Sequence, residues 1–340
     1  MDTIMITGGL GFVGFNLAKY LLKNDYNVVI VDVADFFSRS KFLEQTDRLK
    51  IIYQNLAADR AYEKLPEKIK YVIHLAALPH VDYSSYHENE TILNNILSLK
   101  NILLYSIENG SKVVFSSSVE VYGGCNKNNI YSETDALRPQ SIYGVSKQFC
   151  EQLVAYYQDK FNIDCVTLRF TNLYGVGQLP DRIIPRNICR LAEGIRGDLT
   201  ANFYRDFLYV EDAIKAVFYM LMKGKPGTYN LSSGKSYNMK FVIDEIVKSF
   251  NTNDISNFDS IAISENRGKY LNIDNSKILT YVQLPMTSIE DGIKFTVEWY
   301  LKNRDWYIQF RPQYEKERND ERFIIDANYL HLYFKEKESI

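Results

Sequence analysis

The sequence has 340 residues, 46% of them hydrophobic, and its 40 basic and 42 acidic side chains leave a formal charge of −2. This composition excludes a disordered chain, and the near-neutral balance gives no overall field that would attract nucleic acid or an anionic membrane. We therefore expect one large or two closely associated domains whose partner is a small molecule.

Cysteine usage and hydropathy bear on the compartment. The four cysteines show no paired spacing, and the chain opens without a charged segment followed by a long apolar run. No stretch reaches the roughly 18 consecutive apolar residues of a membrane span. We expect a reduced, cytoplasmic protein with no membrane segment and no metal site.

Over the first 175 residues, short apolar runs rich in β-branched residues alternate with longer stretches of helical periodicity. Strands are expected at 3–6, 28–32, 50–53, 71–75, 112–117 and 164–170, and helices at about 12–24, 88–108 and 143–161. This alternation is typical of βαβ units with a parallel sheet. It predicts an α/β fold with a Rossmann-like doubly wound sheet over residues 1–175.

After residue 175 the alternation loosens into mixed segments. Helices are expected at 211–223, 239–249 and 288–302, and a short strand at 228–231. We interpret residues 176–303 as mainly a smaller mixed α/β substrate lobe and read this strand as part of it, while the Rossmann core is expected to receive further elements after residue 175. Residues 304–340 form a charged, tyrosine-rich extension whose role the sequence leaves open.

A glycine-rich turn connects the first strand to the first helix. Gly9, Gly11 and Gly14 fit G-x-G-x-x-G, whereas Gly8, Gly11 and Gly14 fit G-x-x-G-x-x-G, and both spacings bring backbone N–H groups close to a dinucleotide pyrophosphate. Asp32 ends the second strand 18 residues after Gly14. Its carboxylate would accept hydrogen bonds from the adenosine ribose and repel a 2′-phosphate, which favours NAD over NADP.

A second motif combines a phenol, an amine and a hydroxyl. Tyr143 and Lys147 are four residues apart and share one face of a helix, and Ser118 stands at the end of the fifth strand. A nearby ammonium stabilises a phenolate, which lets a tyrosine act as a base near neutral pH. Together with the glycine turn and Asp32, this set indicates a dinucleotide-dependent enzyme.

Further segments extend the pattern: HLAALPHVDYS, Asn95, SSSVEVYG, RFTNLYG, RDFLYVEDA and SIEDGIKFTVEWY. Over about residues 3–303 the chain resembles the extended short-chain dehydrogenase/reductases, and specifically the NAD-dependent nucleotide-sugar epimerase/dehydratase family. This resemblance implies NAD as cofactor, a nucleotide-diphosphate sugar as substrate and a homodimer.

The resemblance also implies roles for residues. Tyr143 would take a proton from a sugar hydroxyl, normally at C4, Lys147 would lower the pKa of Tyr143 and hold the nicotinamide ribose, and Ser118 would bind the reacting oxygen. The residues implied to contact NAD are Gly8, Gly11, Phe12, Val13, Asp32, Asn55, Leu56, Leu75, Ala76 and Ala77, with Asn95 as a support beside them. Asn172, Arg205 and Arg267 would contact the diphosphate of the substrate.

The residues after Ser118 bear on the reaction. Dehydratases of the family show Thr-Asp-Glu there, and Val119 of this chain cannot donate a proton as the aspartate does. Glu120 remains, either as a base that removes a proton beside a C4 ketone or as a residue that points away from the sugar. We expect an epimerase acting through transient C4 oxidation.

The alternatives are a decarboxylase or 4,6-dehydratase that uses Glu120, a 4-keto-sugar reductase, and a non-catalytic NAD-sensing protein. Two histidines receive weaker assignments: His74 is expected in the core and His80 in an exposed loop near the sugar.

Overall fold

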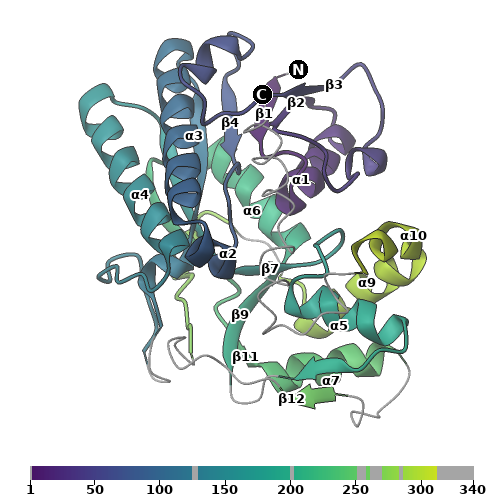
Figure 1. Ribbon diagram of the computed structural model, residues 1–340. Helices are drawn as coiled ribbons and strands as arrows, with labels where there is room; N and C mark the ends of the chain where they lie inside the picture. Colours follow the sequence, from purple (N-terminus) through teal and green to yellow (C-terminus); the bar gives the residue numbers. More distant parts are fainter. Residues whose placement is uncertain are drawn as a thin grey trace.

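A computed structural model describes residues 2–124, 129–199, 203–250, 258–260, 270–282 and 286–311. Its centre is a seven-stranded sheet in the order β10-β6-β5-β4-β1-β2-β3 (Figure 1), and every adjacent pair is parallel. The strands are β1 Thr3–Thr7, β2 Asn27–Asp32, β3 Leu49–Tyr53, β4 Tyr71–His74, β5 Lys112–Ser118, β6 Cys165–Phe170 and β10 Gly227–Leu231. The predicted doubly wound parallel sheet is confirmed.

Helices cover both faces of this sheet. Helices α1 (Phe12–Lys23) and α6 (Val210–Lys223) pack on one face, and α3 (Glu88–Asn109) and α4 (Ile142–Phe161) pack on the other. Because side chains alternate along a strand, Ile4 and Ile6 of β1 belong to the first layer and Met5 belongs to the second. Both faces are therefore apolar, which explains the nearly unbroken hydrophobic runs of the strands.

A smaller lobe lies beyond the carboxyl ends of the strands (Figure 1). Its helices α5 (Ile183–Ala192), α7 (Met239–Ser249) and α9 (Ile289–Lys302) share one apolar core with α10 (Arg304–Tyr307). Its strands are β7 Asn172–Tyr174, β9 Tyr204–Tyr209 and β11 Ser236–Asn238 in one sheet, and β8 Gly197–Leu199 with β12 Phe258–Ser260 in another.

Short elements complete the described chain. They are the helices α2 Val81–Tyr86 and α8 Ser276–Leu279 and the 3₁₀ turns η1 Ser40–Phe42, η2 Ala61–Lys64, η3 Val119–Tyr122 and η4 Ile308–Phe310. Within the described ranges, none of the helices combines the length and the apolar character that crossing a membrane requires.

The assignment of strand 228–231 to the substrate lobe was wrong. This strand is β10, which pairs with β6 through Thr228–Thr167 and Asn230–Arg169 and forms an edge of the main sheet. Helix α6, which precedes β10, packs against α1 in the same layer. The pairing joins segments about 60 residues apart in sequence, and local periodicity carries no information about such a partner.

Candidate active site

A cavity of about 530 Å³ lies between the carboxyl ends of the main strands and the lobe. Ligands of open α/β sheets bind at this edge. All of the predicted cofactor residues except Asn95 line the cavity, and so do Ser118, Glu120, Tyr143, Lys147, Asn172 and Arg205. Arg267 lies outside the described residues.

The glycine turn forms one end of the cavity. Gly8 has a φ of +68°, and a Cβ at this position would lie 2.7 Å from the backbone nitrogen of Ala76. Gly11 caps α1 without a side chain, and Gly14 packs against the backbone of Gly8 and Gly9. Gly8, Gly11 and Gly14 line the cavity, whereas Gly9 is not among the lining residues and packs against Ile30. The structure therefore selects the G-x-x-G-x-x-G spacing for the cavity wall.

Asp32 lies next to this turn at the end of β2. Its carboxylate accepts hydrogen bonds from the backbone N–H groups of Leu10 at 2.9 Å and Val33 at 2.8 Å. Burial raises the pKa of Asp32 to about 6, and these two hydrogen bonds act in the opposite direction. The carboxylate is thus ionised at neutral pH, as the binding of ribose hydroxyls requires. A glycine cradle without room for a Cβ, a helix N-terminus and this acceptor fit NAD.

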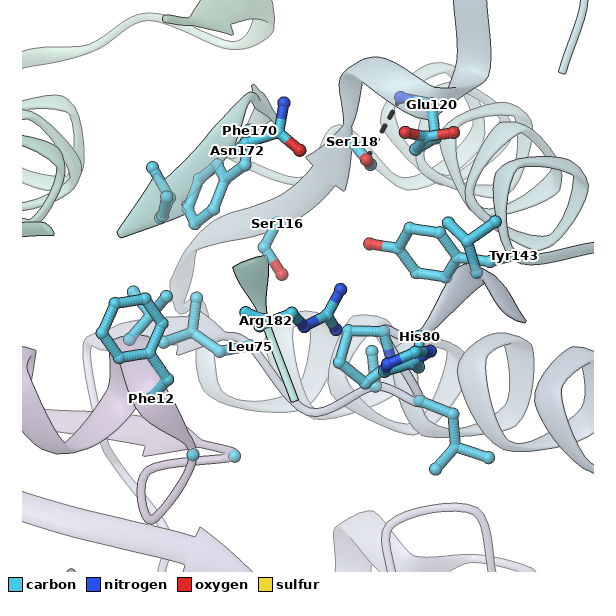
Figure 2. A pocket seen from close by; sticks show the side chains of 18 of the residues that line it. Phe12, Leu75, His80, Ser116, Ser118, Glu120, Tyr143, Phe170, Asn172 and Arg182 are labelled. Atoms are coloured by element: carbon cyan, nitrogen blue, oxygen red, sulfur yellow. Dashed lines mark hydrogen bonds between the residues drawn. The ribbon is translucent and has the colours of Figure 1, made fainter. Parts of the chain in front are cut away.

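Tyr143 and Lys147 lie at the start of α4, which Ser141 caps by accepting a hydrogen bond from Gly144. The Tyr143 hydroxyl points into the cavity toward the end of β5, where Ser116 and Ser118 lie (Figure 2). Burial raises the pKa of Tyr143 to about 12, while the nearby Ser118 hydroxyl acts in the opposite direction. Ser118 is therefore close enough to the phenol to favour its ionised form.

The Lys147 ammonium lies 5.9 Å from the centre of the Tyr143 ring and donates a hydrogen bond of 2.8 Å to the carbonyl of Ser116. Burial lowers the pKa of Lys147 to about 8, so the ammonium form still prevails at neutral pH. A fixed positive charge thus lies beside the ring, one helical turn from Tyr143.

The three serines at the end of β5 have different partners. Ser116 donates to the carbonyl of His74 at 3.0 Å, and Ser117 donates to Glu151 at 2.5 Å. Ser118 accepts a hydrogen bond of 3.2 Å from the backbone N–H of Glu120 and so caps η3. Ser116 and Ser117 are thus engaged in hydrogen bonds within the fold.

Glu120 lies on η3, close to Ser118, and lines the cavity near Tyr143 (Figure 2). Its negative charge raises the pKa of Tyr143, which places the carboxylate within electrostatic reach of the phenol. In the part of the chain that the structure describes, no side chain forms an ion pair with it. Val119 instead is buried and packs with Val121 and Leu271.

Asn95 stands behind the cavity wall rather than in it. Its side chain accepts a hydrogen bond of 2.7 Å from Leu78 N–H and donates one of 3.0 Å to Ser146, which ties the loop after β4 to α4. Asn172 donates to the carbonyl of Asp206 at 3.1 Å. The Arg205 guanidinium stacks 3.7 Å above the Phe203 ring. Asn172 and Arg205 thus lie on the lobe side of the cavity.

The structure adds a group that the sequence interpretation missed. His80 was expected in an exposed loop, but it is buried. Its Nε2 lies 3.1 Å from the Asp181 carboxylate, and its Nδ1 accepts a hydrogen bond from the N–H of Tyr83, which caps α2. Burial and the charge of Arg182 lower the pKa of His80, so the ring is neutral. The signal in the sequence was an acidic-basic pair inside the apolar segment LPDRII.

Asp181 and Arg182 come from the loop before α5 and both line the cavity. Burial raises the pKa of Asp181, but the hydrogen bond from His80 and the charge of Arg182 outweigh it and leave the pKa below its ordinary value. Its Oδ1 atom is buried and has no hydrogen-bond partner among the described residues. The Arg182 guanidinium points toward the space beside Tyr143 (Figure 2) and lowers the pKa of that phenol.

A doubly wound sheet with a glycine cradle and a Ser-Tyr-Lys set at its carboxyl edge defines the extended short-chain dehydrogenase/reductase class. The model of the NAD dependent epimerase/dehydratase family matches residues 4–232, and the chain belongs to this family. The family is NAD-dependent, in agreement with the fit of the glycine cradle and Asp32.

Individual relatives carry different activities. The chain is 31% identical to an Arabidopsis thaliana protein described as a trifunctional UDP-glucose 4,6-dehydratase, 3,5-epimerase and 4-keto-L-rhamnose reductase, over 89% of this chain and 48% of that protein. It is 29% identical to the dTDP-D-glucose 4,6-dehydratase of Mus musculus, over 88% of this chain and 89% of the relative. The chain thus spans about half the length of the Arabidopsis relative.

A solved structure gives a similar picture of the fold. The UDP-glucuronic acid 4-epimerase of Bacillus cereus, crystallised with UDP-glucuronic acid and NAD, is similar to this chain with a TM-score of 0.80 and 27% identity. The similarity covers 88% of this chain and 99% of that one. Epimerases and dehydratases are therefore both among the proteins that this chain resembles.

Proposed function

We propose that the chain is an NAD-dependent nucleotide-sugar epimerase that acts through transient oxidation at C4 of the sugar. The observation that carries the proposal is the set of Ser118, Tyr143 and Lys147 in one cavity, next to the carboxylate of Glu120, which forms no ion pair with the described residues. The neighbouring Val119 is buried and cannot supply the acid of an ordinary dehydration.

In this proposal Tyr143 removes the proton from the C4 hydroxyl, and Ser118 donates a hydrogen bond to the same oxygen. The positive charges of Lys147 and Arg182 favour the phenolate, against the effect of burial. Bound in the cradle of Gly8 and Gly11, NAD would supply the acceptor for the C4 hydride and later the donor. Tyr143 gives its proton back when the ketone is reduced, so the site is unchanged after one turnover.

Glu120 extends the chemistry to the neighbouring carbon. A ketone at C4 acidifies the protons at C3 and C5, and the Glu120 carboxylate, which forms no ion pair within the described ranges, is available to accept one of them. A water molecule would return a proton to the opposite face of that carbon and so invert it before the ketone is reduced. Glu120 is thus the residue on which epimerisation beside C4 depends.

Asp181 supplies a further contact for the sugar. Its buried Oδ1 atom lacks a partner within the described ranges, and a buried acceptor without a hydrogen bond is costly. A sugar hydroxyl would satisfy it, while His80 holds the other oxygen. Arg182, Asn172 and Arg205 also line the cavity, and the two guanidinium groups suit a nucleotide diphosphate.

The second candidate function is a 4,6-dehydratase. The Arabidopsis and mouse relatives carry that activity in their names, and Glu120 would serve as its base. This reaction also needs an acid for the leaving hydroxyl at C6, a role that Val119 cannot fill.

We also propose that the protein forms a homodimer. Helices α3 and α4 lie side by side on the outer face of the sheet (Figure 1), and they expose Leu93, Phe149 and Tyr156 by 50% or more. An exposed apolar surface of this kind is typical of a subunit contact. Light scattering coupled to gel filtration measures the mass, and a monomer at micromolar concentration contradicts the dimer.

A panel of nucleotide sugars incubated with the protein and NAD in deuterated water, read by NMR, tests the proposed reaction. Deuterium at C3 or C5 of an epimerised product supports the role of Glu120, whereas inversion at C4 without deuterium confines the chemistry to that carbon. A 4-keto-6-deoxy product identifies the dehydratase, and absence of turnover with every sugar rejects the enzyme proposal.

A further inference from the structure

The loop between β2 and β3 contains a fully buried arginine outside the proposed reaction. Arg39 is 1% exposed, and it follows Asp32 by seven residues. Its Nε donates to the carbonyl of Gly177 at 3.0 Å, and its NH1 group donates to the carbonyl of Leu10 at 3.1 Å. One side chain therefore joins the glycine turn of the sheet domain to the loop between β7 and α5 of the lobe.

Leu10 is held from two directions by this arrangement. Its N–H donates to Asp32 and its carbonyl accepts from Arg39. Leu10 lies inside the turn Gly8–Gly11, whose backbone forms the wall of the cavity. Fixing both polar groups of this peptide fixes the surface on which the cofactor pyrophosphate would rest.

Aromatic rings surround the charge of Arg39, and the carboxylates of Asp181, Asp35 and Asp32 favour it from beyond ion-pair distance. Its guanidinium lies 4.8 Å from the centre of the Phe37 ring, 5.8 Å from that of Phe15 and 5.9 Å from that of Trp306. No ion pair to Arg39 is present among the described residues. Burial lowers the pKa of Arg39 to about 10, so it stays charged at neutral pH. Burying a charge costs free energy, so we expect the rings around Arg39 to stay packed against its guanidinium.

The start of the C-terminal extension provides that closure. Trp306 of α10 is 1% exposed, and its ring N–H donates to the carbonyl of Phe37 at 2.8 Å. Phe310 packs against Phe37 with ring centres 6.0 Å apart. Helices α9 and α10 thus cover the outer side of the loop 33–42, whose residues Phe37 and Arg39 line the cavity on the inner side.

We propose that Arg39 and Trp306 are positioning residues that hold the loop 33–42 closed over the adenosine end of the cavity and thereby slow the dissociation of NAD. Neither residue takes part in proton transfer. An enzyme that oxidises and reduces the same sugar needs no external cofactor only if NAD stays bound between the two steps. The proposal rests on NAD as cofactor and does not depend on which sugar reaction the site performs.

The test compares Trp306→Ala and Trp306→Phe with the matched control Asp305→Asn, an exposed neighbour on the same helix. Each full-length protein is passed through gel filtration, and the NAD that remains is released and counted per chain. The protein is then loaded with labelled NAD. The dissociation rate of NAD is measured from the release of the label into an excess of unlabelled NAD, without any sugar present. The concentration of added NAD for half-maximal activity is compared with the KM for the nucleotide sugar.

We expect Trp306→Ala to dissociate NAD at least tenfold faster, equivalent to about 1.4 kcal/mol, and to need more added NAD with little change in the sugar KM. Trp306→Phe, which keeps a ring but loses the hydrogen bond to Phe37, should fall between it and the wild type. Arg39→Met serves if Trp306→Ala does not fold. The proposal is overturned if Trp306→Phe and Arg39→Met release NAD at the wild-type rate. It is also overturned if Asp305→Asn releases NAD as fast as Trp306→Ala does.

Discussion

The adenosine end and the sugar end of the cavity are built in different ways. The adenosine end is formed mainly by backbone groups. Gly8, Gly11 and Gly14 leave room for a ligand to approach the backbone closely, and two backbone N–H groups fix the Asp32 carboxylate. The sugar end consists of side chains from separate segments, such as Glu120, Tyr143 and Asp181. In the proposed function, the first end holds NAD and the second end holds the sugar.

This contrast predicts that substitutions at the two ends have separable effects. Changes at the sugar end should alter turnover and leave NAD in place, whereas changes at the adenosine end should alter NAD binding first. The following tests run from the largest expected effect to the smallest.

Tyr143→Phe removes the base and keeps the ring that lies beside Lys147. We expect turnover to fall by about 10²–10⁴-fold, the usual contribution of a general acid–base group, with NAD content unchanged. Activity within a few-fold of the wild type would show that another group takes the proton. Tyr219→Phe, on the exposed side of α6, is the control.

Glu120→Gln keeps the size of the side chain and removes its negative charge. If Glu120 removes a proton beside the ketone, epimerisation should fall by roughly 100-fold, and deuterium should no longer enter C3 or C5 from the solvent. Unchanged turnover in this variant would confine the chemistry to C4. NAD content, measured on the same sample, should match the wild type.

Asp32→Asn tests the adenosine end. A hydrogen bond to a charged group contributes about 1.5–3 kcal/mol, so we expect NAD to bind roughly 10-fold to 100-fold more weakly. The pKa of about 6 adds a pH dependence: in the wild type, NAD affinity should fall as the pH decreases through about 6, since the carboxylate becomes protonated. A titration by calorimetry between pH 5 and 8 should show this slope in the wild type and lose it in Asp32→Asn.

Asp181→Asn tests the proposed contact with the sugar, for which the smallest effect is expected. An amide keeps a hydrogen-bond acceptor but loses the charge, so the KM for the nucleotide sugar should rise by about tenfold or less, with kcat changed less than KM. Asp181→Leu should raise the KM further, since it removes the acceptor. Equal effects of both variants on kcat, with an unchanged KM, would place Asp181 outside sugar binding. Thermal unfolding of each variant controls for loss of the His80 contact.

Particular residues show which predictions rested on local sequence. The turn from Gly8 to Gly14, Asp32 and the pair Tyr143 and Lys147 each lie within a continuous segment whose spacing reflects a local geometric need. The alternation of strands and helices is local in the same sense, and the predicted doubly wound sheet is confirmed by the strand order. Short-range rules are visible in a single sequence because the chain itself imposes the distances.

Other residues required the folded chain. The placement of β10 in the main sheet, the burial of His80 against Asp181, and the contact of Trp306 with Phe37 join segments 60 to 270 residues apart. Each of these segments is unremarkable on its own. The sequence predicted an exposed His80 because a loop position is usually solvated, and only the approach of Asp181 from the lobe removes that water.

By itself, the sequence determined the fold class and the cofactor, and it singled out Ser118, Tyr143 and Lys147 as the residues proposed for proton transfer, because glycine cradles, ribose acceptors and helix-face pairs depend on short-range backbone geometry. The tertiary structure decided which glycines line the cavity, that Glu120 lies beside Tyr143, and that the first helix of the C-terminal extension packs on the cofactor loop. These features arise from contacts between distant segments, whose distances are set by the packing of the two lobes and not by the chain between them.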